Sequence, residues 1–271
     1  MNAVQAVVLG VLQGLTEFLP VSSTAHLRVF PAFLGWEDPG AAFTAVTQLG
    51  TTVAVLIYFR RDLRRILVTW ARSLRDPSKR SSLDARLGWY IGLGTIPIGM
   101  FGLAFKDQIE HEARNLTLIG SALIVVGLVL LLAERTGTRE RSLDAMTRRD
   151  AAVIGLAQAT ALVPGVSRSG ATISAGLFRG LERPAAARYS FLLSVPAIVL
   201  SGLLELSDIG AGDGPGPAAT ALATVVAFAV GYAAIAWLLR FLATHSTGVF
   251  VAYRIFLGAL VLALAWTDVI S

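Results

Sequence analysis

Six stretches of this chain are long, apolar and nearly free of charged side chains. They cover residues 41–59, 87–105, 116–133, 189–204, 218–239 and 249–266. About 20 apolar residues in a helix span the hydrocarbon core of a bilayer, and most of these stretches approach that length. The pattern predicts six transmembrane helices and therefore an all-α polytopic membrane protein.

Composition supports this assignment. The 271 residues are 55% apolar and only 15% charged, with a mean hydropathy of +0.67. These charges are too few to cover the surface of a soluble protein of this length. Residues 1–12 are apolar but lack a basic start and a small-residue cleavage site, so we expect them to belong to the mature fold rather than to a signal peptide. The chain has no cysteine, which excludes disulfides and thiolate metal sites.

Basic residues are concentrated in some of the connections between apolar runs, and these connections are predicted to face the cytoplasm. The connections at 106–115 and 205–217 have no such excess and are predicted to face outside, together with both chain termini. Membrane orientation also explains the pI near 10.1, so we expect no nucleic-acid partner. The two most basic connections contain Arg60, Arg61, Arg64, Arg65, Arg72, Arg75, Lys79, Arg80 and Arg86, and Arg135, Arg139, Arg141, Arg148 and Arg149.

Two segments cannot be simple crossings in this arrangement. Residues 3–35 must begin and end outside, whereas residues 151–179 must begin and end inside. We predict that each segment is a re-entrant hairpin, in which two short helices meet at a loop within the membrane. Such a loop is stable only where protein or water encloses its backbone.

The two hairpin segments also resemble each other. GVLQGLTEFLPVSS from Gly10 matches GLAQATALVPGVSRS from Gly155, with glycine, glutamine, proline and serine recurring in order. This predicts an internal duplication within a single membrane domain, residues 1–271, with a first repeat at 1–135 and a second at 150–271. Each repeat has one hairpin and three spans. An odd number of spans inverts the second copy, which gives an inverted-topology repeat.

The first hairpin carries a carboxylate at predicted membrane depth. Gln13 and Glu17 are four residues apart and therefore share a helix face before the break at Pro20. A carboxylate in this position costs about 2.5–3.5 kcal/mol on insertion scales, and such residues usually face a protein interior where they have a partner. Glu17 is thus a candidate functional residue. The alternative is a solvated Glu17 near the interface, or one that caps the hairpin.

Hydroxyl groups and a histidine follow the break. Ser22, Ser23 and Thr24 supply the hydroxyls, and His26 can exchange a proton near neutral pH. Ser22 taken alone is equally well explained as a helix N-cap. The combination, rather than any single residue, indicates a reactive site.

The second tip, LVPGVSRSGATIS at residues 162–174, is rich in small residues and hydroxyls and leads into a helix. Such a loop offers backbone N–H groups to an anion. Arg168 adds a planar fork that matches phosphate oxygens. Another reading is that Arg168 neutralises Glu17 as a buried pair, and the two readings are compatible. The neighbouring candidates are Gly165, Ser167, Ser169, Gly170 and Thr172.

Together the tips offer the groups that phosphoryl transfer to water requires: an arginine for the transferred group, a hydroxyl or water to attack, and an acid or base. The apolar helices predict a substrate whose remainder dissolves in lipid, hence a lipid phosphate or diphosphate. A transporter or flippase for such a lipid is the alternative, because inverted repeats occur widely in transporters. The density of nucleophilic and proton-transfer groups favours the enzyme.

These motifs resemble those of bacterial undecaprenyl-diphosphate phosphatases of the bacitracin-resistance type. The family signatures are (Glu/Gln)xxxGlu followed by PVSST and His, and PGxSRSGAT; here they read QGLTE, PVSSTAH and PGVSRSGAT. The likeness covers essentially the whole chain. It implies hydrolysis of undecaprenyl diphosphate to undecaprenyl phosphate in the bacterial cell membrane, with Mg²⁺ or Ca²⁺ as a divalent cation, to recycle the carrier lipid for peptidoglycan synthesis. A homodimer among membrane lipids is a further expectation.

The resemblance also implies roles for individual positions. Glu17, Ser23, His26 and Arg168 are the expected catalytic residues, with Ser23, His26 or water as the nucleophile and Arg168 on the phosphate. Many family members have glutamate where this chain has Gln13, which leaves Glu17 as the expected acidic metal ligand. The expected substrate-binding residues are Gln13, Ser22, Thr24, Ser167, Ser169, Gly170 and Thr172.

Overall fold

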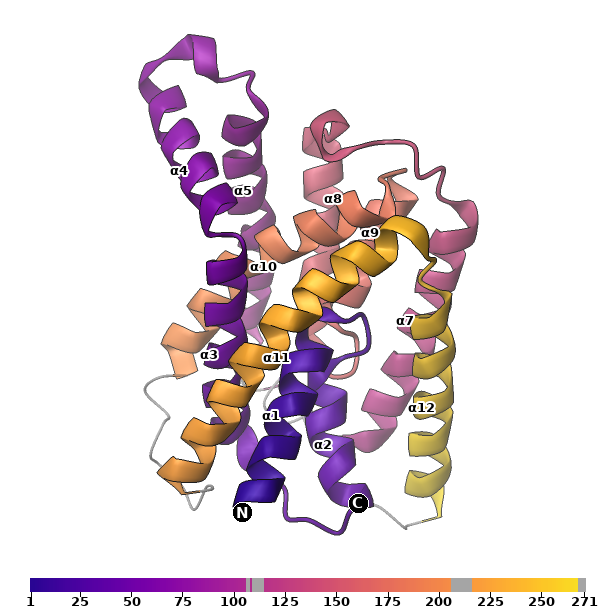
Figure 1. Cartoon of the computed structure of the whole chain (residues 1–271). Helices are drawn as coiled ribbons and strands as arrows, with labels where there is room; N and C mark the ends of the chain where they lie inside the picture. The colour runs from indigo at the N-terminus through magenta and orange to yellow at the C-terminus, as the bar shows by residue number, and fades with distance from the viewer. Residues whose placement is uncertain (106–107, 109–114, 206–215, 268–271) are drawn as a thin grey trace.

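The structure of the protein, a computed structural model, describes residues 1–105, 108, 115–205 and 216–267. Within these ranges it consists of eleven α-helices and short 3₁₀ turns, and it has no β-sheet (Figure 1). Most of the two connections predicted to face outside, and the last four residues of the chain, lie outside the described residues. The helices are α1 (Ala3–Phe18), α2 (Ser23–Phe33), α3 (Gly40–Tyr58), α4 (Arg60–Arg75), α5 (Leu83–Ala104), α7 (Leu116–Thr136), α8 (Arg148–Ala159), α9 (Arg168–Phe178), α10 (Arg183–Glu205), α11 (Pro217–Thr244) and α12 (Gly248–Trp266).

Each predicted apolar run lies on one long helix and extends at most one residue beyond it. These helices are α3, α5, α7, α10, α11 and α12. Among the described residues, α5, α7, α11 and α12 are long and apolar enough to cross a membrane by themselves. The pair α3 and α4 qualifies as a fifth candidate span, although it is bent by 71°. The chain is therefore a polytopic, all-helical membrane protein.

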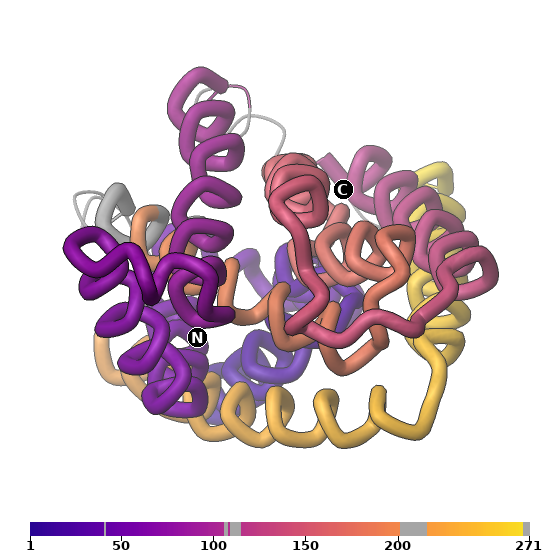
Figure 2. Tube along the Cα trace, turned by 90° about the horizontal axis from the view of Figure 1, so that it is seen from above, coloured from indigo at the N-terminus to yellow at the C-terminus, as the bar shows by residue number. Residues whose placement is uncertain are grey.

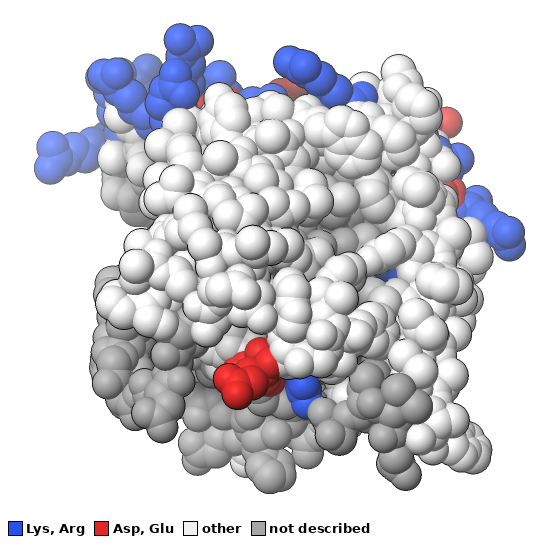
Figure 3. All heavy atoms as spheres, turned by 60° about the horizontal axis from the view of Figure 1, so that its bottom comes forward, with Lys and Arg blue, Asp and Glu red and all other residues white. Residues whose placement is uncertain are grey.

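The first arginine-rich connection is helical rather than a loop. It forms α4, which packs along the start of α5 and extends from one end of the molecule (Figure 1). Ile66 and Ser73 are buried, while most of the arginines are exposed, which is the pattern of an amphipathic helix. Trp70 and Trp89 meet edge to face with ring centroids 5.6 Å apart. Lysine and arginine gather along this end of the molecule, which we call the basic end (Figure 3).

Two helical hairpins lie inside the bundle. Helix α1 is followed by α2 through a tip at residues 19–22, and α8 is followed by α9 through a longer tip at residues 160–167. The α1–α2 hairpin begins at the end opposite the basic end, whereas α8 begins at the basic end, and the two tips meet near the middle (Figure 1). Viewed from above, α1 and α2 are surrounded by longer helices, with α11 along one side and α7 and α12 along another (Figure 2).

The tips share an unusual backbone conformation. Ser22 has φ 75° and ψ 104°, and Ser167 has φ 70° and ψ 116°. Left-handed φ values are uncommon for residues other than glycine. Each serine is the N-cap of the second helix of its hairpin, and its side chain accepts a hydrogen bond from the backbone N–H three residues later. Helices α2 and α9 therefore begin with the same N-cap conformation.

Close helix crossings hold the first helix of each hairpin. Helix α1 packs on α11, and α8 packs on α5. A Cβ atom on Gly10 would lie 2.5 Å from the carbonyl oxygen of Ala223, and one on Gly155 would lie 2.7 Å from the Cα of Gly94. Glycine is required at both crossings because backbone atoms, rather than movable side chains, occupy the adjacent space.

The α8–α5 crossing yields a stability prediction. We expect Gly155→Ala to lower the free energy of unfolding by about 1–3 kcal/mol, because the added methyl group forces two backbones apart. Gly92→Ala on α5 is the matched control, since a Cβ at Gly92 would meet no atom within 4 Å. Thermal unfolding of both variants in detergent measures the difference. Equal melting temperatures would show that the helices separate here without cost.

Candidate active site

An ion pair joins the two hairpin tips. Arg168, the first residue of α9, donates through Nη2 to Glu17 Oε1 near the end of α1. The other carboxylate oxygen, Glu17 Oε2, accepts from Ser23 Oγ at 2.8 Å and from Gln13 Nε2 at 3.2 Å. The Glu17 side chain is only 5% exposed. Donors from α1, α2 and α9 therefore converge on one buried carboxylate.

Most of the other hydroxyls at the tips have structural partners. Ser22 and Ser167 cap their helices, and Ser169 Oγ donates to the carbonyl oxygen of Leu19 at 2.9 Å, which is a second link between the tips. Thr172 donates to the carbonyl oxygen of Arg168 at 2.7 Å and shares a hydrogen bond of 2.6 Å with Ser190. The structure thus brings these predicted substrate-binding residues to the tips.

Three further predicted positions differ in accessibility. Ser23 is half-buried, Thr24 is exposed, and Gly170 is buried, with the Arg254 guanidinium 3.3 Å from the position of a Cβ. Thr24 is therefore the tip hydroxyl most open to a ligand. Substrate contact by these residues stays a prediction.

His26 is buried on α2, one turn after Ser23, and both of its ring nitrogens have partners. Nδ1 lies 2.6 Å from the carbonyl oxygen of Ser22, and Nε2 lies 2.6 Å from Tyr253 Oη. A carbonyl oxygen can only accept, so Nδ1 carries the proton and Nε2 accepts from the tyrosine in the neutral ring. No hydrogen bond joins His26 to Ser23 or Glu17 within the described part of the chain. The partner of Ser23 is Glu17.

Arg254 is a central residue that the sequence analysis missed. It lies on α12 with 0% exposure, and among the described residues it donates only to backbone carbonyl oxygens. Its acceptors in the tips are Pro20 at 3.2 Å, Gly165 at 3.0 Å and Val166 at 3.1 Å. Two further acceptors, at 3.2–3.3 Å, are on α7. The available signal was the single charge inside the apolar run 249–266, because a charge at membrane depth generally has a function.

Arg254 is neutralised by no carboxylate in the described residues. At the tips, its guanidinium instead satisfies three carbonyl groups that the broken helices leave without intrahelical donors. The result is a fixed positive charge at the junction of the two tips, close to the start of α9, where Arg168 lies. This charge favours an anion at the tips.

The residues at the tips provide oxygen ligands for a hard cation, but too few for a complete site. No cluster of three or more His, Cys, Asp or Glu groups with metal-binding geometry occurs among the described residues. Beside Glu17, however, Gln13 Oε1 is buried and has no hydrogen-bond partner in the described structure. One or two protein oxygens together with substrate phosphates are a common environment for Mg²⁺. Gln13 and Glu17 fit that arrangement.

Comparisons with known proteins point to one family and to relatives that share one enzyme name. A family described as "Bacitracin resistance protein BacA" matches residues 6–260. The chain is 56% identical to the undecaprenyl-diphosphatase of Nocardioides sp., with 98% of each chain covered. It is 52% identical to that of Thermobifida fusca, covering all of this chain and 93% of the relative, and 54% identical to that of Mycolicibacterium smegmatis, covering all of this chain and 99% of the relative.

The contacts of Arg254 predict that replacing this residue, even by lysine, lowers the stability of the protein. Arg254→Lys keeps the charge, but a single ammonium group cannot replace a planar fork that reaches five carbonyls. Since each unsatisfied buried carbonyl costs about 1–3 kcal/mol, we expect a loss of at least about 2 kcal/mol of stability. Thermal unfolding in detergent measures this loss, and exposed Arg240→Lys on α11 is the control. Similar melting temperatures for the two variants would contradict the role given to Arg254.

Proposed function

This chain belongs to the bacitracin resistance protein BacA family, and we propose that it is an undecaprenyl-diphosphatase. It removes the terminal phosphate of undecaprenyl diphosphate and releases undecaprenyl phosphate and inorganic phosphate. The observation that carries this proposal is the junction of Ser23, Glu17 and Arg168 between the tips, in a chain whose relatives bear the same enzyme name. A flippase would bind the lipid there, but it has no need for a hydroxyl held against a carboxylate.

We place the enzyme in the bacterial cell membrane with six spans and two re-entrant hairpins. Six long helices, and two hairpins whose tips meet from opposite ends, support this topology. The basic end faces the cytoplasm in this arrangement, and the N-terminus at the opposite end faces outside. Residues 1–135 and 150–271 form the inverted repeats, which the matching conformations of Ser22 and Ser167 support. A homodimer stays a prediction.

Substrate binding in this proposal depends on positive charge. The terminal phosphate binds the guanidinium of Arg168 and the first backbone N–H groups of α9, which have no intrahelical acceptors. The buried charge of Arg254 favours the same anion. Because Arg168 is paired with Glu17 in the structure, the phosphate competes for this contact. That competition releases the carboxylate as the anion binds.

The proposed reaction begins with attack by Ser23. As Oγ bonds to the terminal phosphorus, Glu17 accepts its proton, and the bond from phosphorus to the bridging oxygen breaks. Undecaprenyl phosphate leaves, and water then hydrolyses the phosphoserine to inorganic phosphate. The 2.8 Å hydrogen bond from Ser23 to Glu17 favours this carboxylate, rather than His26, as the first proton acceptor. His26 and water remain the alternative nucleophiles.

A divalent cation, Mg²⁺ or Ca²⁺, is part of the proposal. Gln13 and Glu17 would hold it together with diphosphate oxygens of the substrate. When bound, the cation supplies charge neutralisation for the transferred group. The unpartnered Gln13 Oε1 supports this assignment.

Arg168→Ala tests the anion site. Loss of an electrostatic contact of this type costs about a hundredfold to a thousandfold in rate, so we expect phosphate release from undecaprenyl diphosphate to fall by at least about a hundredfold. Arg72→Ala, an exposed arginine on α4, is the control for charge and should retain normal turnover. A parallel assay with chelator tests the cation requirement. Near-normal turnover by Arg168→Ala would exclude the proposed site.

Two substitutions distinguish the nucleophiles. We expect Ser23→Ala to abolish turnover and trapping of a phosphoenzyme, because it removes the attacking oxygen. His26→Ala should slow turnover without preventing formation of a phosphoserine. Rapid-quench experiments with substrate labelled in the terminal phosphate measure both steps. An active Ser23→Ala beside an inactive His26→Ala would move the nucleophile role to His26 or to water.

A further inference from the structure

A second concentration of arginine surrounds a pocket at the base of the α8–α9 hairpin. The pocket has a volume of about 620 Å³ and lies at the basic end, where α5 and α8 begin and α9 ends. It is therefore at the end of the hairpin away from the tips. Its charged lining consists of Arg86, Arg141, Arg148, Arg149, Arg179 and Asp144.

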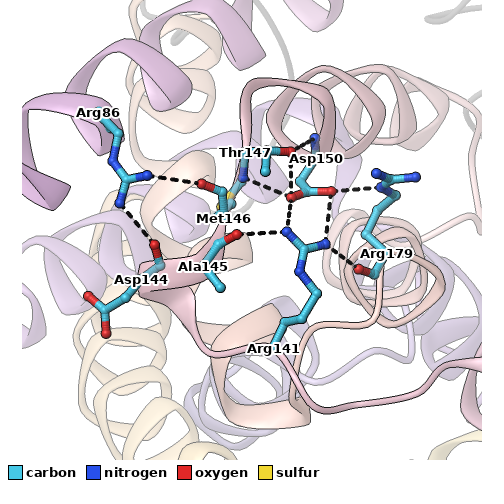
Figure 4. Close-up of polar contacts among 8 residues, drawn as sticks. All are labelled: Arg86, Arg141, Asp144, Ala145, Met146, Thr147, Asp150 and Arg179. Carbon is cyan, nitrogen blue, oxygen red and sulfur yellow. Dashed lines mark hydrogen bonds and ion pairs between the residues drawn. The ribbon is translucent and has the colours of Figure 1, made fainter. Parts of the chain in front are cut away.

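A buried carboxylate organises one wall of this pocket. Asp150 has 0% exposure and accepts from Arg141 Nη2 at 2.7 Å and from Arg179 Nε at 2.7 Å (Figure 4). Burial alone would raise the pKa of the Asp150 carboxyl, but its hydrogen bonds to Arg141, Arg179 and Thr147 hold the pKa well below its usual range. Asp150 therefore stays ionised, and its single negative charge neutralises one of the two arginines.

Both terminal nitrogens of Arg141 donate hydrogen bonds within the protein, whereas Arg179 and Arg86 keep unused donors. Arg141 also donates to the carbonyl oxygens of Ala145 and Arg179, at 2.7 and 2.6 Å. Arg179 contacts Asp150 through Nε, and its terminal nitrogens have no partner in the described structure (Figure 4). Arg86 is held by the carbonyl oxygens of Asp144, at 2.9 Å, and Met146, at 3.5 Å, while its buried Nε has no partner there. Two guanidinium groups are thus pinned at one edge with donors to spare.

The start of α8 adds an arrangement that packing does not explain. Arg148 and Arg149 are the first two residues of the helix, and both are exposed without a partner in the described residues. Cations at a helix N-terminus are unfavourable, because this end already carries partial positive charge and free N–H groups. An anion bound at this site would instead interact favourably with the helix N-terminus and with both arginines.

The net charge of the pocket lining also favours an anion. The five arginines outnumber Asp144 and Asp150 by three. A general preference of basic residues for one membrane side accounts for their number but not for their convergence on a concave site. Guanidinium groups held in fixed positions suit the oxygens of a phosphate group.

We propose that this basic pocket is a second anion site, which binds the phosphate or diphosphate group of a ligand at the membrane surface. The group belongs either to a lipid headgroup or to a free phosphate compound. The twelve residues of α8 separate the pocket from the tips by roughly 18 Å at a rise of about 1.5 Å per residue. The site is therefore distinct from the Glu17–Arg168 junction, and its existence does not depend on the proposed hydrolysis.

Binding measurements on the purified, full-length protein test the proposal with two probes. Methylenediphosphonate, which resists hydrolysis, represents a free diphosphate and is titrated by calorimetry. Phosphatidic acid represents a lipid phosphate and is measured by native mass spectrometry, with phosphatidylcholine as the neutral reference. The test variant is Arg148→Gln/Arg149→Gln, and the matched control is Arg72→Gln/Arg75→Gln, which removes two exposed arginines of the basic end outside the pocket.

We expect the pocket variant to weaken binding of at least one probe tenfold or more, while the control stays within twofold of the unmodified protein. The responding probe identifies the source of the phosphate group. Unchanged binding of both probes by the pocket variant would overturn the proposal, as would an equal loss in the control, since that would reflect overall charge. Phosphate release measured on the same samples reports the proposed function separately.

Discussion

The fold depends on one requirement: two interrupted helices in the middle of the protein must find donors for the carbonyl groups that their breaks expose. Water satisfies such groups at a protein surface, but the hydrocarbon core provides none. Arg254 meets this need by donating to Pro20 in one tip and to Gly165 and Val166 in the other. One guanidinium therefore links the two hairpins at their tips.

This constraint also produces the chemistry. Once the tips are held together, Glu17 at the end of α1 meets Arg168 at the start of α9, and Ser23 at the start of α2 meets the same carboxylate. Each catalytic candidate is near a helix end, where backbone groups lack intrahelical partners and can interact with a ligand. In the proposed function, the positive charge that stabilises the tips also attracts the diphosphate of the substrate. Stability and substrate preference therefore share a physical cause.

The sequence predicted the elements better than their contacts. Apolar runs located the six long helices, and the pairing of Glu17 with Arg168 followed from the cost of isolated charges at membrane depth. Sequence could not identify the partner of Ser23, because Glu17 and His26 are both near it along the chain and only the path of the tip decides between them. Tyr253 and Arg254 were missed because their apolar surroundings resemble a lipid-facing helix. The helical conformation of α4 was not predicted, because its arginines indicate only the membrane orientation, whereas the helix is indicated by its amphipathic spacing.

A constant spacing between the two hairpins supports the proposed internal duplication. Ser22 and Ser167 are 145 positions apart, as are Gln13 and Gln158, and Pro20 and Gly165. In this register Ser23 corresponds to Arg168, so the first position of the second helix holds the proposed nucleophile in one copy and the phosphate-binding group in the other.

The same register pairs Glu17 with Leu162. Gln158 is fully buried like Gln13, yet neither polar atom of its side chain has a partner in the described structure, whereas Gln13 still donates to Glu17. A buried amide without partners is costly, and the leucine at the position that corresponds to Glu17 leaves Gln158 without the acceptor that Gln13 has. In the proposed duplication, the two hairpins share their helix caps and their carbonyl contacts with Arg254, whereas their reactive side chains differ around one carboxylate, Glu17.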